Sequence, residues 1–182
     1  MNSTPINDLY SGSLFKMKDE RGSFARLFCD EELKEILGDR RIVQINQSVT
    51  KEKGSIRGLH FQKPPFAEMK IVRCVKGAVW DIAVDLRRDS NTFLKWHAIE
   101  LSEEKNNFYI IPEGFAHGFQ TLTEDCEMLY LHTQSYNKEY EDGLNPIDEK
   151  LAIEWPLPVT TLSERDKNHT FLTENKFKGL II

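Results

Sequence analysis

KIVRCVKGAVWDIAVDL, residues 70–86, has the alternating pattern of two β-strands that meet at a turn formed by Lys76 and Gly77. After the turn, one face of the second strand carries Trp80, Ile82 and Val84, and the other carries Asp81, Ala83 and Asp85. The alternation therefore predicts a strand with two chemically different faces.

Further strand-like runs surround this segment, with turn-type residues between them: 42–49, 93–101, 107–111, 118–122 and 127–133. Many short strands at such spacing indicate a sandwich or a barrel. No repeat, low-complexity tract or linker divides the chain, so we expect one domain over residues 1–182. From these patterns the fold class predicted is all-β, a sandwich or a closed barrel, with a few short helices.

Helix signals are few. Asp30 is placed to cap a short helix over 31–37, which has two glutamates in its first turn and ends at Gly38. The last thirty residues are rich in proline, serine and charged groups, and we expect them to wrap over the strands.

The composition limits the classes of function. The 182 residues are 40% hydrophobic and 29% charged, as in an ordinary globular protein, and the net charge of −5 argues against general nucleic-acid binding. Cys29, Cys74 and Cys126 lie far apart without CxxC spacing, which favours reduced thiols in the cytosol. We see no secretory signal and no run of 18 apolar residues, so we expect a cytoplasmic protein without direct membrane contact.

Two motifs each place a histidine beside glycines in an apolar strand pattern: IRGLHFQ at 56–62 and IPEGFAHGF at 111–119. The charged residues around them would sit badly in a plain core. Two strands of one small β domain can direct His60 and His117 into the same cavity, so the motifs indicate a functional site.

The glycine and histidine spacing within 54–77 resembles the first motif of the cupin jelly rolls, and 112–117 resembles the second. Metal-binding cupins carry a histidine where this chain has Gln62 and a glutamate where it has Lys70. A lysine ammonium repels a divalent cation and offers it no lone pair. The resemblance therefore implies a cupin-type cavity without a metal, and no residue is assigned as a metal ligand.

A fuller resemblance, to the dTDP-4-dehydrorhamnose 3,5-epimerase family, covers nearly the whole chain from residue 19 to residue 166. It is carried by DERG, VQIN, RGLHFQ, KIVR, GAVWDIAVDLR, the turn at 90–93, PEGFAHGF, the tyrosine of EMLYLHT, IEWP and LSERD. The resemblance implies a homodimeric jelly roll that epimerises a nucleoside-diphosphate 4-keto-6-deoxyhexose without a cofactor. It also implies a role in surface polysaccharide or lipopolysaccharide synthesis.

The reaction explains the residue types. Inverting a carbon beside a ketone requires removal of its proton, stabilisation of the enolate, and return of a proton to the other face. A histidine suits the base, because its ordinary pKa of roughly 6.5 lies near working pH. By resemblance, His60 is the base, Tyr130 the proton donor and Asp166 the carboxylate paired with the base, a role that Asp81 could share. The substrate-binding candidates are Arg21, Gln44, Asn46, Arg57, Lys70, His117, Glu141 and Arg165.

Each candidate also has a plain structural interpretation. Tyr130 fits a packing aromatic on a half-buried strand, and Ser163 to Asp166 fits a capping box at the start of a final helical turn. His117 could bond neighbouring backbone, and the arginines and lysines could be scattered surface charges. Two rival functions stay open as well: a metal-dependent dioxygenase or sugar-phosphate isomerase using His60, Glu68 and His117, and a sugar-binding cupin without catalysis.

The chain departs from the family pattern where the nucleotide base and part of the sugar would lie. The departures are Ser23, Arg26, Ile45, the Ser135-Tyr136 pair and Pro146. They leave dTDP, CDP, GDP and UDP carriers open, and also whether C3, C5 or both are inverted. The type of reaction is less affected than the choice of substrate.

Overall fold

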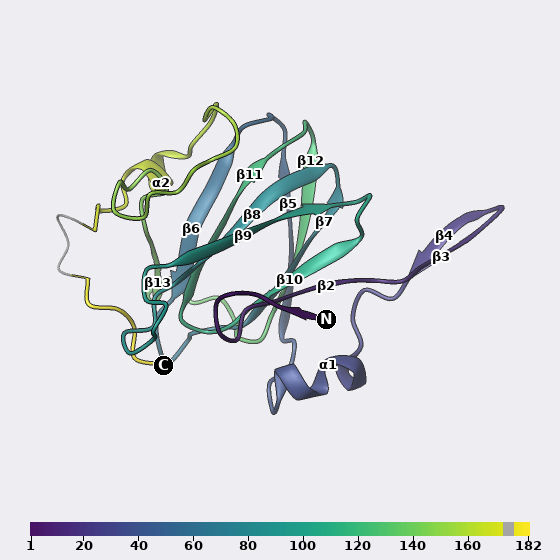
Figure 1. Ribbon diagram of the computed structural model, residues 1–182, viewed down its shortest axis with the longest axis horizontal. Coiled ribbons are helices and arrows are strands. Elements are labelled where there is room, and N and C mark those ends of the chain that lie inside the picture. The colour runs from purple at the N-terminus through teal and green to yellow at the C-terminus, as the bar shows by residue number, and fades with distance from the viewer. Residues whose placement is uncertain (173–176) are drawn as a thin grey trace.

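The computed structural model describes residues 1–172 and 177–182, and it consists mainly of β-strands (Figure 1). The strands are β1 (Asn2–Ser3), β2 (Tyr10–Ser13), β3 (Lys16–Asp19), β4 (Gly22–Ala25), β5 (Gln44–Thr50), β6 (Ile56–Gln62), β7 (Lys70–Lys76), β8 (Ala78–Asp85), β9 (Trp96–Ser102), β10 (Asn107–Ile111), β11 (Phe115–Thr121), β12 (Cys126–His132) and β13 (Glu141–Gly143). The described helices are α1 (Asp30–Leu37) and α2 (Glu164–Lys167).

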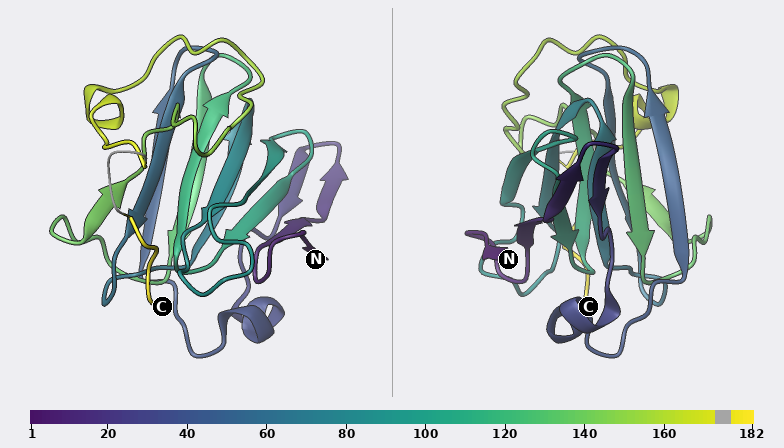
Figure 2. Two further views of the ribbon diagram at one scale, coloured as in Figure 1. Left: turned by 60° about the vertical axis from the view of Figure 1, so that its left-hand side comes forward. Right: turned by 90° about the vertical axis from the view of Figure 1, so that its right-hand side faces the viewer.

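Two antiparallel sheets form the body of the molecule (Figure 2). One has six strands in the order β1-β2-β10-β7-β12-β5, and the other has five in the order β13-β6-β11-β8-β9. The main core contains Val72, Tyr109 and Met128 from the first sheet and Ala83 and Phe119 from the second. These side chains fill the space between the inner faces, as in other sandwiches of sheets. The all-β jelly-roll prediction is therefore confirmed.

The strand-like runs in the sequence are strands in the structure, with ends shifted by up to three residues. The turn before Ala78 differs from a hairpin turn. Gly77 has a left-handed φ of 77°, but β7 pairs with β10 and β12, whereas β8 pairs with β9 and β11. The chain therefore crosses from one sheet to the other at Gly77, because both strands find their hydrogen-bond partners elsewhere.

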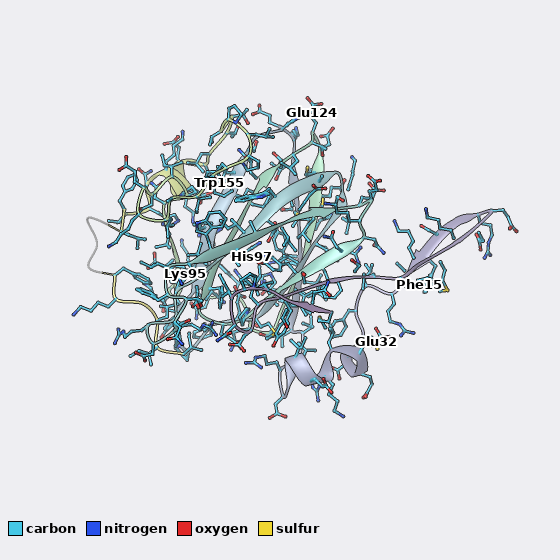
Figure 3. All side chains as sticks on the ribbon, in the orientation of Figure 1. Phe15, Glu32, Lys95, His97, Glu124 and Trp155 are labelled. Carbon is cyan, nitrogen blue, oxygen red and sulfur yellow. The ribbon has the colours of Figure 1, made fainter. Side chains whose placement is uncertain are left out.

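The outer face of each sheet has its own cover. Trp80, Ile82 and Val84 point away from the main core and pack with Leu151 and Leu172 of the C-terminal segment. The expected C-terminal wrap is thus present over the described residues, and Figure 3 labels Trp155 within it. Residues of α1 cover part of the outer face of the six-stranded sheet. The predicted division of β8 into two faces is confirmed.

The helix α1 begins one residue earlier than expected and is capped differently. Cys29 is the N-cap residue, no side chain caps the helix, and Asp30 is the first helical residue. The carboxylate of Asp30 instead accepts hydrogen bonds from Arg41, at 3.1 and 3.3 Å. The prediction that Asp30 caps the helix was therefore wrong. The prediction that the helix ends at Gly38 is confirmed, and Gly38 has a φ of 59°.

A hairpin of β3 and β4 projects from the body, on the side away from the C-terminal segment (Figure 1). It forms a separate two-stranded sheet and pairs with neither large sheet. Within the described residues, neither helix has the length and apolar character that a membrane span needs.

Candidate active site

The two sheets enclose a cavity of about 1050 Å³ that opens beside β5 and the C-terminal segment. All but one of the predicted site residues line it: Gln44, Asn46, Arg57, His60, Lys70, His117, Tyr130, Glu141, Arg165 and Asp166. Residues separated by as many as 122 positions in the chain thus meet at one site, because strands of both sheets and the last helix border the same space.

His60 and Asp166 form a hydrogen-bonded pair at the cavity wall. The His60 Nε2 to Asp166 Oδ1 distance is 2.6 Å, and Asp166 is 4% exposed. Burial alone would raise the pKa of Asp166, but the hydrogen bond and charge of His60 hold that pKa below its usual value. An ionised carboxylate only accepts hydrogen bonds, so Nε2 carries the hydrogen and the lone pair of neutral His60 lies on Nδ1.

The short helix that presents Asp166 is capped as the sequence indicates. Ser163 Oγ accepts a hydrogen bond from the backbone N–H of Asp166 at 3.1 Å. The capping interpretation and the pairing with His60 are therefore compatible, since one uses the backbone of Asp166 and the other its carboxylate. The cap directs the carboxylate toward β6.

Two glycines allow β6 and β11 to cross closely beside His60. A Cβ on Gly58 would lie 2.6 Å from Gly118 Cα, and one on Gly118 would lie 2.7 Å from the Arg57 oxygen. The pairing register shifts here, between His117 and Phe119. In a regular strand, residues three apart point to opposite faces. Beside this irregularity, Arg57 and His60 are three residues apart on β6 and both line the cavity.

Alanine at Gly58 is expected to destabilise the fold more than alanine at Gly22. The two glycines have similar φ values, 125° and 136°, but no atom lies within 4 Å of a Cβ at Gly22. The difference between the two variants therefore measures the clash of the added Cβ with the neighbouring strand. We expect this clash to lower the free energy of unfolding by about 1–3 kcal/mol. Urea unfolding at one protein concentration measures both variants, and equal losses would show that β6 and β11 do not need this approach.

Tyr130 stands on the opposite wall from His60, because β12 belongs to the six-stranded sheet and β6 to the five-stranded one. Its hydroxyl oxygen lies 2.8 Å from Ser48 Oγ on β5. Burial raises the pKa of Tyr130 well above its ordinary value, so the side chain is a neutral phenol that holds its proton. Tyr130 thus packs against the main core and also lines the cavity.

Lys70 is held in a buried charged cluster beside Tyr130. Its Nζ lies 3.1 Å from Glu68 Oε1, and the other oxygen of Glu68 lies 2.9 Å from His132 Nδ1. Burial opposes ionisation of Glu68, but Lys70 and His132 together keep the pKa of Glu68 below its usual value. Lys70 therefore presents a fixed cation whose charge is partly balanced by Glu68.

His117 lines the same cavity as Lys70 and is hydrogen-bonded to Asp81. The His117 Nε2 atom is 2.9 and 3.0 Å from the two oxygens of Asp81, which is fully buried. Burial raises the pKa of Asp81, and His117 opposes this shift. Asp81 was expected to share the pairing with His60, but it pairs with His117 instead, since β8 lies next to β11.

Polar residues continue around the open side of the cavity. The Gln44 amide donates to Asn46, and the Asn46 amide lies 3.4 Å from His132 Nε2. Near His60, Glu141 binds Arg165 at 2.6 Å and accepts from the Tyr136 hydroxyl at 2.7 Å. Burial opposes ionisation of Glu141, yet these two partners lower its pKa.

Arg21 is the predicted site residue that the fold does not bring to the cavity. It lies at the tip of the β3–β4 hairpin, and its guanidinium binds Asp19 at 2.6 Å. Within one chain, Arg21 cannot act with the other candidates.

The ligand set of the metal-cupin alternative does not come together. Each of its side chains has a different partner: His60 binds Asp166, His117 binds Asp81, and Glu68 binds Lys70. Among the described residues, the compact group of possible ligands is instead His60, Asp166 and His169.

Several residues in or beside the cavity were missed in the sequence. Ser48 and His132 alternate with Asn46 and Tyr130 on their strands, so the two-residue strand period could have identified them. Tyr136 was noted only as a departure from the family pattern. No sequence signal indicated His169, because its place depends on the irregular C-terminal segment.

Comparison with known proteins identifies the family. The family model described as dTDP-4-dehydrorhamnose 3,5-epimerase matches residues 3–174. An enzyme of that name from Sinorhizobium fredii is 39% identical over 185 residues, covering 96% of this chain and 95% of the relative.

Solved structures that are similar to this chain belong to enzymes of the same kind. A dTDP-6-deoxy-D-glucose-3,5-epimerase from Legionella pneumophila, in complex with dTDP-4-keto-L-rhamnose, is 36% identical with a TM-score of 0.91 and covers 98% of this chain and 96% of that one. A 3'-monoepimerase from Streptomyces bikiniensis, in complex with dTDP-quinovose, is 31% identical with a TM-score of 0.89, covering 95% and 88%. The chain therefore belongs to the dTDP-4-dehydrorhamnose 3,5-epimerase family and is an epimerase, which is an isomerase by reaction class.

Proposed function

We propose that this epimerase inverts C3, C5 or both in a dTDP-linked 4-keto-6-deoxyhexose, with His60 as the base and Tyr130 as the proton donor. The observation that carries the proposal is the placement of these two side chains on opposite walls of one cavity. Inversion requires a proton to leave one face of a carbon and another to arrive at the opposite face. A base and an acid on facing sheets meet that requirement.

His60 takes the proton from the carbon beside the ketone onto Nδ1, and Asp166 stabilises the resulting imidazolium through Nε2–H. The electrons of the broken C–H bond move to the ketone oxygen and form an enolate. Lys70 and His117 line the same cavity, where the Lys70 ammonium can stabilise this oxygen. Tyr130 then gives its proton to the other face of the carbon.

The nucleotide is assigned from the family and from the open side of the cavity. The relatives are named for dTDP sugars, and the solved structures described above contain dTDP-linked ligands. Arg165 and Arg57 border the cavity and can bind diphosphate oxygens, while Gln44 and Asn46 offer amides to a base or a sugar.

The direct test is NMR of dTDP-4-dehydro-6-deoxyglucose incubated with the enzyme in deuterium oxide. Deuterium entry at C3 or C5 together with an epimeric product supports the proposal and assigns the inverted centres. Binding without exchange would instead support a non-catalytic sugar-binding protein. Parallel thermal shifts with dTDP, UDP, CDP and GDP test the base, because selective binding stabilises the folded state.

We further propose that the protein is a homodimer in which the β3–β4 hairpin packs on a second copy. The hairpin and its flanks expose large apolar side chains: Phe15 82%, Met17 52%, Phe24 65% and Leu27 43%. Figure 3 shows Phe15 at the base of the hairpin, outside the body of the chain. Such a patch on a projecting arm is costly in water and favours a partner surface. A second copy would also bring its Arg21 within reach of a cavity.

Replacing both Phe15 and Phe24 with serine is expected to convert a dimer to a monomer, because it removes two exposed apolar anchors of the arm. Light scattering coupled to size-exclusion chromatography measures the mass. The control replaces Phe66 and Phe93 with leucine, because Phe66 packs on Tyr140 and Phe93 on Phe177 rather than on the hairpin. A dimer that persists after the double serine substitution would contradict the role of the arm.

We place the enzyme in a reducing compartment, the cytoplasm. All three cysteines are free thiols, and Cys74 and Cys126 are buried. Cysteines that form no disulfide are typical of the cytosol, where thiols stay reduced.

A further inference from the structure

His169 lies next to the proposed base and its carboxylate, but its ring is not accounted for by the reaction. Its Nε2 is 4.0 Å from Asp166 Oδ1, the same oxygen that binds His60. The His169 and His60 rings are 6.0 Å apart between centroids and meet edge to face. Among the described residues, Nε2 of His169 is buried without a hydrogen-bond partner. A buried polar atom without a partner calls for an explanation.

We propose that His60, Asp166 and His169 form a site for Zn²⁺ or a similar borderline cation, and that binding there switches off the base. One nitrogen from each histidine and one carboxylate oxygen lie within 4.8 Å of one another. Two imidazoles and one carboxylate, with a water in the fourth position, are a known type of zinc ligand set. The binding follows from this geometry, while the inhibition rests on the proposed role of His60.

The distances suit zinc after a small rearrangement. Zinc bonds of about 2.0–2.2 Å in a tetrahedron place neighbouring ligand atoms about 3.3 Å apart. The His60–Asp166 distance of 2.6 Å must open, and the Asp166–His169 distance of 4.0 Å must close, each by about 0.7 Å. The ligand nitrogens of His60 and His169, which lie within 4.8 Å of each other, must also come to about 3.3 Å. Rotations of the side chains can supply these shifts. Mg²⁺ is disfavoured, since it prefers an octahedron of oxygen ligands.

The surrounding charges permit a cation. Arg165 faces the site from α2, but it is paired with Glu141. The carboxylate of Asp142 on β13 also faces His169, and it is itself paired with Lys63. The ring of His169 packs directly on Gly143, where any larger residue would displace it, so β13 holds the third ligand in place.

The inhibition follows from the tautomer of His60. In the resting pair Nε2 carries the hydrogen, and Nδ1 holds the lone pair that accepts the substrate proton. Zinc on Nε2 uses the lone pair of that nitrogen, so the hydrogen of a neutral imidazole must move to Nδ1. Nδ1 then has no lone pair for a substrate proton. Zinc therefore blocks proton abstraction without needing to occupy the sugar position.

The test compares His169→Phe with the wild-type enzyme, because phenylalanine keeps a ring against Gly143 and removes the ligand. Isothermal titration with Zn²⁺ measures binding without substrate, and NMR exchange with increasing Zn²⁺ measures inhibition relative to each protein's own metal-free rate. We expect one Zn²⁺ site in the wild type, with binding and inhibition both weakened at least about tenfold in His169→Phe. The control His97→Phe removes a histidine outside the group and should bind Zn²⁺ like the wild type. Mg²⁺ should neither bind nor inhibit.

Two results would overturn the proposal: equal Zn²⁺ binding by His169→Phe and wild type, or wild-type protein that binds Zn²⁺ in this site and exchanges protons at its full rate. The proposed function is tested separately, by His60 variants in chelator-treated buffer, so its failure would be seen without any zinc experiment.

Discussion

Glutamine in place of His60 is expected to lower epimerisation and solvent deuterium exchange by about 10³- to 10⁴-fold, the upper range for loss of a general base. The amide of glutamine can still donate to Asp166, which holds the wall together, but it cannot accept a proton from carbon at neutral pH. NMR of the sugar in deuterium oxide measures both rates. The folded state is checked by thermal unfolding in the presence of dTDP.

Asp166→Asn gives a graded control for this loss. Asparagine keeps the size and can still bond to His60, but it removes the negative charge that stabilises the imidazolium and selects the Nε2–H tautomer. We expect an intermediate loss, smaller than that of His60→Gln. Exchange at the wild-type rate in His60→Gln would contradict the assignment of the base, whatever the asparagine variant does.

The alternation of residues 70–86 and the two histidine motifs predicted the sheets and the cavity because strand periodicity is local. Once β6 and β11 pair with His60 opposite His117, both rings must share a surface. The same reasoning put Asp81 and Ala83 on one face of β8, and the structure shows that this face is the inner one. It could not choose between His60 and His117 as the partner of Asp81, because that depends on strand order.

Contacts between distant parts of the chain could not be predicted from local sequence patterns. Asp166 meets His60 because the C-terminal segment returns over β6, and the strand pattern carries no information on that return. Family resemblance supplied it. The helix cap at Cys29 was missed because Asp30 found a partner in Arg41, a contact between separate segments. The Glu68–Lys70–His132 cluster likewise joins two strands and a loop.

The facing arrangement also separates the two halves of the reaction. His60 lies on the five-stranded sheet and is held by Asp166 of α2. Tyr130 lies on the six-stranded sheet and is held by Ser48. Among the described residues, no hydrogen bond joins the two pairs. Removing the donor should therefore leave the base intact. The enolate would still form, and the protonated His60 could return a proton to the face from which it came.

Tyr130→Phe is thus expected to lower the rate of epimer formation by about 10²- to 10⁴-fold, while deuterium still enters the unreacted epimer. Phenylalanine fills the same space and removes only the hydroxyl, whose proton the burial of Tyr130 keeps in place. NMR in deuterium oxide distinguishes labelled substrate from labelled product. Tyr136→Phe is the matched control, since Tyr136 also borders the cavity but binds Glu141. If Tyr130→Phe forms the epimer at the wild-type rate, the proton comes from another group and the donor assignment is wrong.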